Sequence, residues 1–416
     1  MEVKAGYKQT EVGVIPEDWK VKKLGELVSL RTGPFGSSVH KSDYINGGIP
    51  FINPIHIFNG ELFPDPDITL SPETVARLSE FQLRTNDIIL GRRGEMGRCA
   101  VVQDDQQGWL CGSGSMIVRP NSKIVPEFLQ RIMSSSYTIA KIEEASVGST
   151  MINLNQAVLF GLSIPYPSLP EQEAIAEALS DADALIEAME QLIAKKRQVK
   201  HGAMQELLTG NKRLPGFHTK WVDCQLSEIG RFSKGKGIKR DETTLDGIPC
   251  IRYGEIYTHH NDYIKEFHSF IPAKIAKQSQ RIYKGDLLFT GSGETAEGIG
   301  KCVAFLGDEE AYAGGDIVIF TPSNQNALYL GYLMNHTSIV TQKSRMAQGD
   351  AIVHISAQKL GQLQLILPSL PEQTAIAEIL SDMDAEIAAL EEKLAKARQV
   401  KQGMMQELLT GRVRLV

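Results

Sequence analysis

A stretch of 47 residues occurs twice in this chain. It begins at Ser168 and again at Ser369, and it ends at Leu214 and Leu415, with a constant offset of 201 positions and no gap. About two-thirds of the aligned residues are identical. A match of this length does not arise from composition alone, so the chain contains an internal duplication.

Each copy of the repeat predicts one long helix. The Ser-Leu-Pro-Glu starts at residues 168–171 and 369–372 fit a capping box with proline in the first turn. Gly210 and Gly411 suit the left-handed position that often follows a helix end. A helix of nearly 40 residues is about 60 Å long at a rise of about 1.5 Å per residue.

Apolar residues recur in both copies at alternating spacings of four and three. This heptad pattern is typical of a coiled coil, and it weakens after Lys196 and Ala397. Two matched seams in one chain favour pairing with each other over the alternative, a single amphipathic helix lying on a domain. The seam residues are Ile175, Leu179, Ala182, Ile186, Met189 and Ile193, then Ile376, Leu380, Met383, Ile387, Leu390 and Leu394.

Charge predicts the orientation of the two helices. The first half of each is acidic, as in Glu187 and Glu386, and the second half is basic, as in Lys196 and Arg398. An antiparallel pair sets acid against base, whereas a parallel pair sets like charges together. The sequence therefore predicts an intramolecular antiparallel coiled coil.

The amino-acid composition limits the classes of protein to which this chain can belong. The chain has 416 residues, of which 42% are hydrophobic and 23% charged, so it can form two cores of ordinary size. No segment is apolar enough for a membrane span, and the N-terminus lacks the apolar core of a signal peptide. The five scattered cysteines lack zinc-binding spacing and favour reduced thiols in a cytoplasmic protein. A net charge of −6 argues against a DNA-coating protein, but not against a reader with local basic patches.

The duplication continues more weakly outside the helices. Residues 19–27 resemble residues 221–229, and residues 148–159 resemble residues 349–360. The chain is thus expected to contain two globular domains, residues 1–165 and 215–365, each followed by a helical spacer, residues 166–214 and 366–416. Each domain is predicted to be α+β, because short strands rich in branched residues alternate with turns and one short helix. The predicted strands are 87–90, 98–102, 115–118, 286–289, 301–305 and 317–320, and the predicted short helices are 126–134 and 327–335.

No catalytic or metal-binding constellation is recognisable, so no catalytic residue and no metal ligand is predicted. Residues 291–296 match G-x-G-x-x-A after a strand, but glycine and another strand follow instead of the helix that a dinucleotide site needs. His259 and His260 are interpreted as surface neighbours on a strand, without a third metal ligand nearby.

Two basic, glycine-rich clusters indicate binding to nucleic acid. Glycines permit close backbone approach, lysine and arginine pair with phosphates, and arginine also fits guanine edges in the major groove. For either cluster alone a solvated loop is an equally good interpretation; their presence in both domains favours binding. The clusters are Arg92, Arg93 and Arg98 in the first domain, and Lys234, Lys236, Lys239 and Arg240 in the second.

The repeated SLPEQ-x-AIAE start, the Arg-Gln-Val-Lys run, the QELLTG end and the IPEDWKVKKLGELVSLRTG opening resemble the specificity subunit of type I restriction–modification systems. The resemblance covers essentially the whole chain. It implies two target recognition domains that each read half of a split duplex DNA site, separated by helices that set the gap between the half-sites. Further DNA-binding candidates are Arg31, Ser37 and Ser38, and two turns represented by Ser149 and Met151, and by Asp350 and Ile352.

The resemblance also implies partners. The helices would dock two modification subunits, which methylate adenine with S-adenosylmethionine, and two restriction subunits, which use ATP and magnesium to translocate and cut DNA. The chain itself would hold no cofactor and catalyse no reaction. Two rival hypotheses are a helical protein–protein scaffold without DNA readout, and the tail of a fused restriction–methylation enzyme; the missing methyltransferase and nuclease motifs count against the second.

Overall fold

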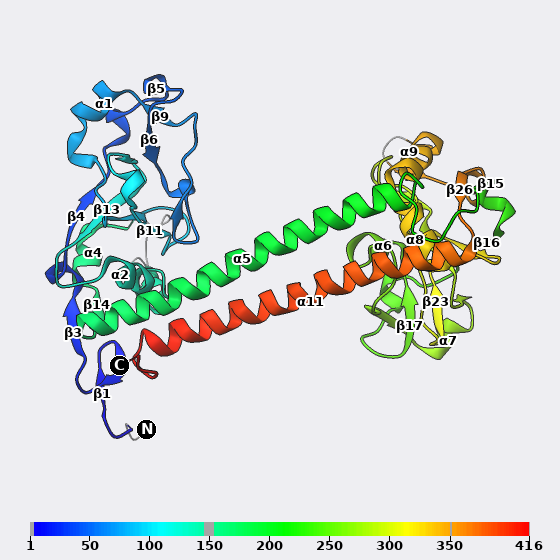
Figure 1. Ribbon diagram of the computed structural model, residues 1–416. Coiled ribbons are helices and arrows are strands. Elements are labelled where there is room, and N and C mark those ends of the chain that lie inside the picture. Colours follow the sequence, from blue (N-terminus) through cyan, green and yellow to red (C-terminus); the bar gives the residue numbers. More distant parts are fainter. Residues whose placement is uncertain (1–3, 145–153, 350–351, 416) are drawn as a thin grey trace. The chain divides into compact units, whose positions relative to one another are not determined.

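The computed structural model describes residues 4–144, 154–349 and 352–415 (Figure 1). The chain divides into two compact units. Unit 1 comprises Met1–Glu190 and Lys393–Val416, and unit 2 comprises Gln191–Glu392. Each unit therefore contains one globular domain together with part of both long helices.

Unit 1 is built around two four-stranded sheets. The first is antiparallel, in the order β11 (Cys99–Val101), β10 (Ile88–Gly91), β13 (Ser115–Pro120) and β4 (Val28–Thr32). The second has the order β12 (Leu110–Cys111), β6 (Ile49–Ile52), β9 (Thr69–Leu70) and β5 (Tyr44–Ile45), with β12 and β6 parallel. Every residue of β10 is buried, which explains its uninterrupted apolar sequence.

Shorter elements complete unit 1. Three antiparallel pairs are β1 (Tyr7–Thr10) with β2 (Gly13–Pro16), β3 (Lys20–Lys23) with β14 (Ser163–Tyr166), and β7 (Ile57–Phe58) with β8 (Glu61–Leu62). The helices are α1 (Pro72–Arg77), α2 (Pro126–Met133), α3 (Ser136–Glu144), α4 (Gln156–Gly161) and the first part of α5 (Leu169–Leu207).

Unit 2 repeats the first sheet strand for strand. Its order is β22 (Cys302–Ala304), β20 (Leu287–Thr290), β24 (Ile317–Pro322) and β16 (Gly230–Lys234). The second sheet differs in order, with β18 (Ser269–Ile271), β17 (Ile248–Ile251), β23 (Ala311–Ala313) and β19 (Gln280–Ile282). Two pairs follow, β15 (Val222–Gln225) with β26 (Gln364–Leu367), and β21 (Ser292–Gly293) with β25 (Val353–His354). The helices are α6 (Tyr253–Thr258), α7 (Ala273–Ala276), α8 (Ala327–Asn335), α9 (Thr337–Met346), α10 (Ala357–Gly361) and part of α11 (Leu370–Leu408).

The α+β prediction is therefore confirmed, and all six predicted strands and both predicted short helices are present. The sequence did not predict the second sheet, because most of its strands contain two or three residues and show no periodicity. No helix in the described ranges is long and apolar enough to cross a membrane.

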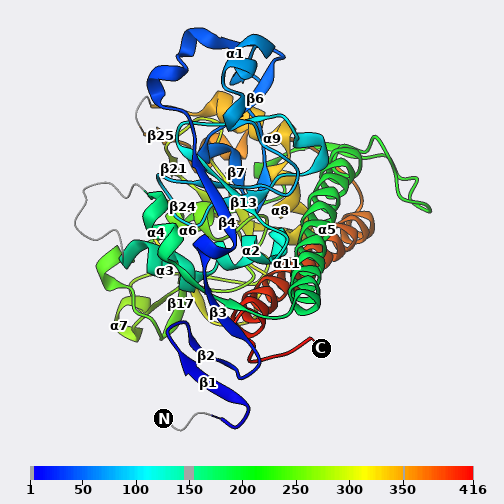
Figure 2. The ribbon, with the colours of Figure 1, turned by 90° about the vertical axis from the view of Figure 1, so that its left-hand side faces the viewer.

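The predicted long helices are confirmed as α5 and α11, of 39 residues each. Gly210 and Gly411 beyond their ends have φ values of +73° and +69°, as predicted. Within each unit the two helices run side by side and antiparallel (Figures 1 and 2). In unit 1, Arg398 pairs with Glu190 and Lys401 pairs with Asp183. In unit 2, acidic residues of α11 pair with basic residues of α5, as in Lys196–Glu386, Arg197–Glu391 and Lys200–Asp384 at 2.6 Å each.

The seam residues face inward, but they do not all serve helix pairing. Ile175 and Leu179 belong to the core of the unit 1 domain, and Ile376 and Leu380 belong to the core of the unit 2 domain. The other seam positions are buried or half-buried. The first turns of each seam thus anchor the helix on the globular domain of its own unit.

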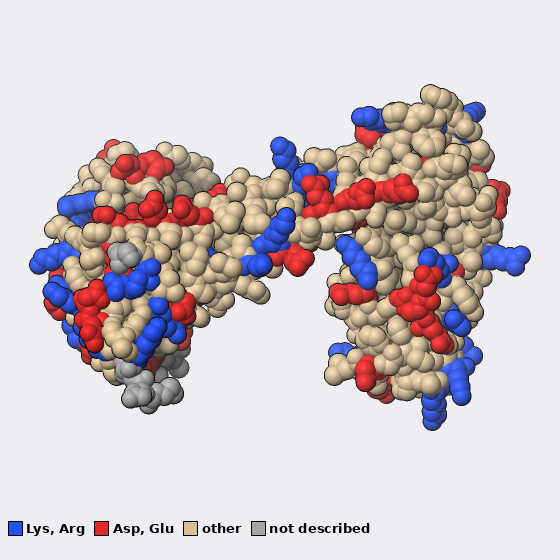
Figure 3. Space-filling model, turned by 60° about the horizontal axis from the view of Figure 1, so that its bottom comes forward, with Lys and Arg blue, Asp and Glu red and all other residues tan. Residues whose placement is uncertain are grey.

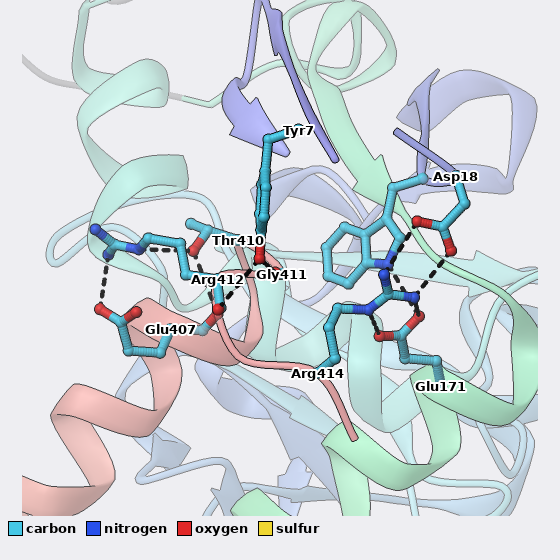
Figure 4. Close-up of polar contacts among 9 residues, drawn as sticks. Tyr7, Asp18, Glu171, Glu407, Thr410, Gly411, Arg412 and Arg414 are labelled. Atoms are coloured by element: carbon cyan, nitrogen blue, oxygen red, sulfur yellow. Dashed lines mark hydrogen bonds and ion pairs between the residues drawn. The ribbon is translucent and has the colours of Figure 1, made fainter. Parts of the chain in front are cut away.

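The repeated motif forms a buried contact that we call the clamp. In unit 1, Glu171 is 1% exposed, and its carboxylate accepts hydrogen bonds from the indole of Trp19, at 2.9 Å, and from the guanidinium of Arg414 (Figure 4). In unit 2, Glu372 accepts in the same way from Trp221 and Arg213. The arginine that follows one long helix therefore holds the glutamate that begins the other. These carboxylates serve the clamp, so the predicted capping box is wrong for them.

The neighbouring glutamines explain another part of the repeat. The side-chain oxygen of Gln172 accepts the backbone N–H of Val125, and that of Gln373 accepts the backbone N–H of Asn326. Both acceptors are buried, and both tie the start of a long helix to the start of the short helix α2 or α8. The Glu-Gln pair of each copy thus fixes the long helix to its domain.

Candidate nucleic-acid interface

Four loops meet at one edge of the first sheet in unit 1. They are residues 33–38, 53–56, 91–98 and 112–115, which we call the loop edge of unit 1. The backbone N–H of Gly33 donates to the carbonyl of Ser115 at 3.0 Å, and that of Arg92 donates to Gly114 at 2.9 Å. A third bond joins Gly112 N–H to the carbonyl of Ile52. The loops therefore form one connected surface.

Unit 2 repeats this arrangement with residues 235–240, 252–259, 291–300 and 313–316, the loop edge of unit 2. Gly235 N–H donates to the carbonyl of Ile317 at 2.8 Å, and Gly314 N–H donates to Ile251 at 2.9 Å. Gly291 N–H donates to the carbonyl of Asp316 at 2.7 Å. The backbone framework is thus common to both units.

Matched glycines make this framework possible. A Cβ atom on Gly33 would lie 2.0 Å from the carbonyl oxygen of Gly112, and one on Gly235 would lie 1.9 Å from that of Gly314. No side chain fits at either position without moving backbone. The duplicated glycines therefore bring the loops close together, and the side chains around them are free to differ.

The three arginines of the unit 1 cluster differ in their exposure and in their partners. Arg93 is exposed, whereas Arg92 is half-buried, and its Nε donates to the carbonyl of Leu154 at 2.9 Å. Burial lowers the pKa of Arg92, and the charge of Arg93 adds to this effect. Arg98 pairs with Glu95 at 2.6 Å, which offsets its charge. Arg93 is therefore the residue of this cluster best placed to meet an anion.

Some of the other DNA-binding candidates of unit 1 lie at the loop edge. Ser37 is exposed and Ser38 half-buried on the loop that follows β4, beside Phe35, which is 85% exposed. Arg31 lies within β4 and pairs with Glu80 beside a separate cavity of about 740 Å³ that Arg84 and Arg119 also line. The structure does not bring Arg31 into the loop edge.

The basic cluster of unit 2 lies at the end of β16 and on the residues that follow it. Lys234, Lys236, Lys239 and Arg240 are all exposed, and no ion pair is found for their side chains in the part of the chain that the structure describes. They surround Ile238, a buried β-branched residue with φ +60°, a conformation that is strained for isoleucine. Such strain gathers at functional sites when the surrounding structure enforces it.

Beside Ile238 is a cavity of about 680 Å³. Its polar lining includes Arg240, Arg252, Tyr253, His259 and His268. The rings of His259 and His268 stack with centroids 4.1 Å apart. Arginine, tyrosine and imidazole offer both hydrogen bonds and flat faces to a nucleobase.

The two adjacent histidines differ from their interpretation as surface residues on a strand. They follow the end of α6, where His259 is exposed and His260 is 3% exposed. Burial, followed by the nearby His268, lowers the pKa of His260 to about 4. Among the described residues no group of three histidine, cysteine or acidic side chains is arranged to hold a metal ion.

The two predicted turns are only partly described. Ser149, Met151 and Asp350 lie outside the described residues, and Ile352 is 60% exposed. Ile352 precedes β25, which pairs with β21, and the Nδ1 of His354 lies 3.0 Å from the hydroxyl of Ser292. The G-x-G-x-x-A segment that failed as a dinucleotide site is therefore part of the loop edge. In the sequence this segment follows a strand, as the arginine-bearing loop of unit 1 does. This shared position could have identified it as part of the loop edge.

Charges of both signs are interspersed over the face shown in Figure 3, in both domains. The described cysteines are unpaired, and burial raises the pKa of Cys99 and of Cys250 to about 12.

Comparisons with known proteins agree with the duplicated fold. The family model described as "Type I restriction modification DNA specificity domain" matches residues 16–196 and again residues 218–399. The putative type I restriction enzyme MjaX specificity subunit of Methanocaldococcus jannaschii is 24% identical, over 98% of this chain and 97% of the relative. The MjaVIII specificity subunit of the same organism is 27% identical over 51% of this chain, which spans about half of that relative's length.

Solved structures share the architecture. The S subunit of a type I restriction–modification system from M. genitalium has a TM-score of 0.59 at 16% identity, covering 98% of both chains. The HsdS subunit from Thermoanaerobacter tengcongensis has a TM-score of 0.51 at 18% identity, covering 96% of this chain and 98% of the other. At these identities the likeness concerns the fold.

Proposed function

Since this chain belongs to the family of type I restriction–modification DNA specificity domains, with two copies of the domain, we propose that it reads a bipartite, asymmetric site on duplex DNA. Each loop edge would read one half-site. The observation that carries this proposal is that one backbone framework is present twice with different side chains on it. A protein that bound the same ligand twice would need the same side chains at both edges.

The chemistry of the two edges suits DNA. Exposed Arg93 in unit 1 and the exposed lysines of residues 234–239 in unit 2 have no ion-pair partner among the described residues, so their charges suit contacts to phosphates. Phosphate contacts position a protein on the duplex, and contacts to base edges give specificity. We assign base contacts in unit 2 to the cavity lined by Arg252, Tyr253 and His268, and in unit 1 to the loop that carries Ser37.

The long helices would set the gap between the half-sites and dock partners. Their paired faces are used within the chain, whereas apolar side chains stay exposed elsewhere on them, at Leu185, Leu192, Val199 and Val400. Exposed apolar residues on a helix suit a protein interface. We assign these surfaces to two modification subunits, and we assign adenine methylation with S-adenosylmethionine, and cleavage with ATP and magnesium by two restriction subunits, to partners.

Replacing Arg93 with alanine is expected to weaken DNA binding and to lower the slope of log K against log salt by about 0.9, the value for one phosphate contact. The measurement is a salt titration of duplex binding by the chain assembled with its modification partner. Arg84→Ala is the matched control, because Arg84 is an exposed arginine of unit 1 outside the loop edge. Equal slopes for both variants and the parent chain would remove Arg93 from the interface.

A further inference from the structure

Two large apolar side chains are exposed on the loop edge of unit 1. Phe35 is 85% exposed and Ile55 is 76% exposed, the highest values among the large hydrophobic residues that the structure describes in this unit. Single apolar residues are common on protein surfaces, but these two lie on one connected set of loops. Apolar surface gathered at such an edge suits a contact with another molecule.

The loops that carry Phe35 and Ile55 meet at Gly112. A Cβ atom on Gly112 would lie 2.4 Å from the side-chain oxygen of Asn53, and one on Gly33 would lie 2.0 Å from the carbonyl oxygen of Gly112. Phe35 lies two residues after Gly33. Ile55 lies two residues after Asn53. The two apolar residues therefore belong to neighbouring loops of the same edge.

The turn that carries Ile55 is held in place on both sides of this residue. The N–H of His56 donates to the carbonyl of Asn53 at 2.9 Å, and the N–H of Asn53 donates to Nδ1 of His56 at 3.1 Å. His56 is 5% exposed, and burial lowers its pKa, which keeps the ring neutral and Nδ1 able to accept. Pro54 is half-buried, and a Cβ atom on Gly91 would lie 3.2 Å from the Cβ of Pro54. Within this turn only Ile55 is exposed.

The second copy of the fold shows that this turn does not need an apolar residue. In unit 2 the N–H of Glu255 donates to the carbonyl of Arg252 at 3.0 Å, and the N–H of Arg252 donates to the carboxylate of Glu255 at 3.3 Å. The turn has the same length as residues 53–56 and hydrogen bonds between the same two positions. Gly254 occupies the position of Ile55. The fold therefore does not account for an isoleucine there.

Phe35 also lacks an apolar counterpart in unit 2. Two residues after the matched glycine, unit 1 has Phe35 and unit 2 has Gly237. The next residue, Ile238, is 7% exposed. Tyr253 is 43% exposed, but it carries a hydroxyl group. The exposed apolar pair is thus particular to unit 1, and the frame common to both units does not require it.

We propose that Ile55 and Phe35 determine specificity in unit 1 by contacting 5-methyl groups of thymine. The inference rests on the proposed function and names the base chemistry that this loop edge reads. In the major groove the base edges present hydrogen-bond donors and acceptors, and the thymine methyl group is the apolar group among them. Arg93, exposed on another loop of the same edge, suits a phosphate contact. The edge thus combines attachment to the DNA backbone with an apolar reading surface.

The test removes the methyl group from the DNA. In duplexes that carry the motif methylated by the assembled complex, each thymine of the two half-sites is replaced in turn by deoxyuridine. This change keeps the base pair and removes only the 5-methyl group. Binding is measured with the full chain assembled with its modification partner. The parent chain is expected to bind at least one uracil duplex roughly fourfold more weakly than the thymine duplex, the effect of burying one methyl group.

Substitutions link this loss to the two side chains. Within one half-site, Ile55→Ala and Phe35→Ala are each expected to bind a thymine duplex and its uracil counterpart equally, where the parent chain discriminates between them. Ile45→Ala is the matched control, because Ile45 is 41% exposed on β5, outside the loop edge, and it is expected to retain the discrimination. Both substituted residues are exposed, so the variants are expected to unfold at the temperature of the parent chain.

Equal binding of every uracil duplex and its thymine counterpart by the parent chain overturns the proposal. So does discrimination by both variants that equals that of the parent chain, the result expected if the apolar pair instead binds the modification partner. Loss of discrimination in one variant alone assigns the contact to that residue and removes the other from the proposal. These outcomes leave reading of a bipartite site intact, whereas an absence of sequence-specific duplex binding overturns the proposed function together with this inference.

Discussion

Replacing Arg414 with methionine is expected to destabilise unit 1 by about 3–5 kcal/mol, because the substitution leaves a buried carboxylate without its counter-charge. Glu171 is 1% exposed, and its side chain accepts from Arg414 and Trp19 (Figure 4). Arg414 also donates to Asp18 at 2.9 and 3.0 Å, and this contact lowers the pKa of Asp18. Thermal unfolding of the full chain, followed as separate transitions of the two units, measures the loss.

The matched control distinguishes destabilisation by the unpaired buried charge from destabilisation by lost packing. Adding Glu171→Gln to Arg414→Met removes the unpaired charge and keeps an acceptor for the Trp19 indole, so it is expected to restore part of the loss. The same cycle with Arg213 and Glu372 tests unit 2. There Arg213 has the carbonyl of Thr219 as its additional acceptor, instead of a second carboxylate. An equally unstable double variant would show that the charge is not the cause.

Deleting one heptad from both long helices is expected to shorten the gap between the half-sites and to leave both half-site sequences unchanged. Removing residues 185–191 and 386–392 takes out the middle of α5 and of α11 and keeps each seam in its heptad phase. Seven residues correspond to about 10 Å of helix, so the tolerated gap falls by up to about three base pairs. Methylation of duplexes with graded gap lengths measures the change.

The control for this deletion is removal of residues 185–191 alone. With only α5 shortened, ion pairs on the two sides of the deletion, such as Lys200–Asp384 and Lys401–Asp183, can no longer form together. Methylation is therefore expected to fall at every gap length. If the paired deletion methylates the same gap as the parent chain, the helices do not set the spacing.

The sequence predicted the parts of the fold that local patterns encode. The long helices follow from heptad spacing and from Gly210 and Gly411, and their antiparallel order follows from their charge gradient. The clamp was not predicted, because Glu171 lies 152 residues from Trp19 and 243 residues from Arg414. In one sequence, a glutamate in the first turn of a helix looks like a capping residue whether or not distant side chains reach it.

The exposed loops of the candidate interface were predicted in part for similar reasons, and DNA binding by them stays a prediction. Glycines and basic residues in loops located both clusters, since these residue types favour loops and exposure. The sequence could not show that Glu95 pairs with Arg98 and offsets its charge, or that Arg31 forms an ion pair with Glu80. It also could not show that His260 is buried. Lys343 illustrates the general limit, because a lysine near the end of a short helix is expected at the surface. Only tertiary packing placed it beneath Gly300.

In the proposed function, two unlike loop edges on one frame read the two halves of one DNA site. Sequencing of methylated bases in host cells, with the intact gene and with the gene deleted, tests it most directly. We expect one adenine motif made of two different half-sites around an unread gap, present with the gene and lost without it. Identical adenine methylation in both strains, or the loss of a single uninterrupted motif, would contradict it.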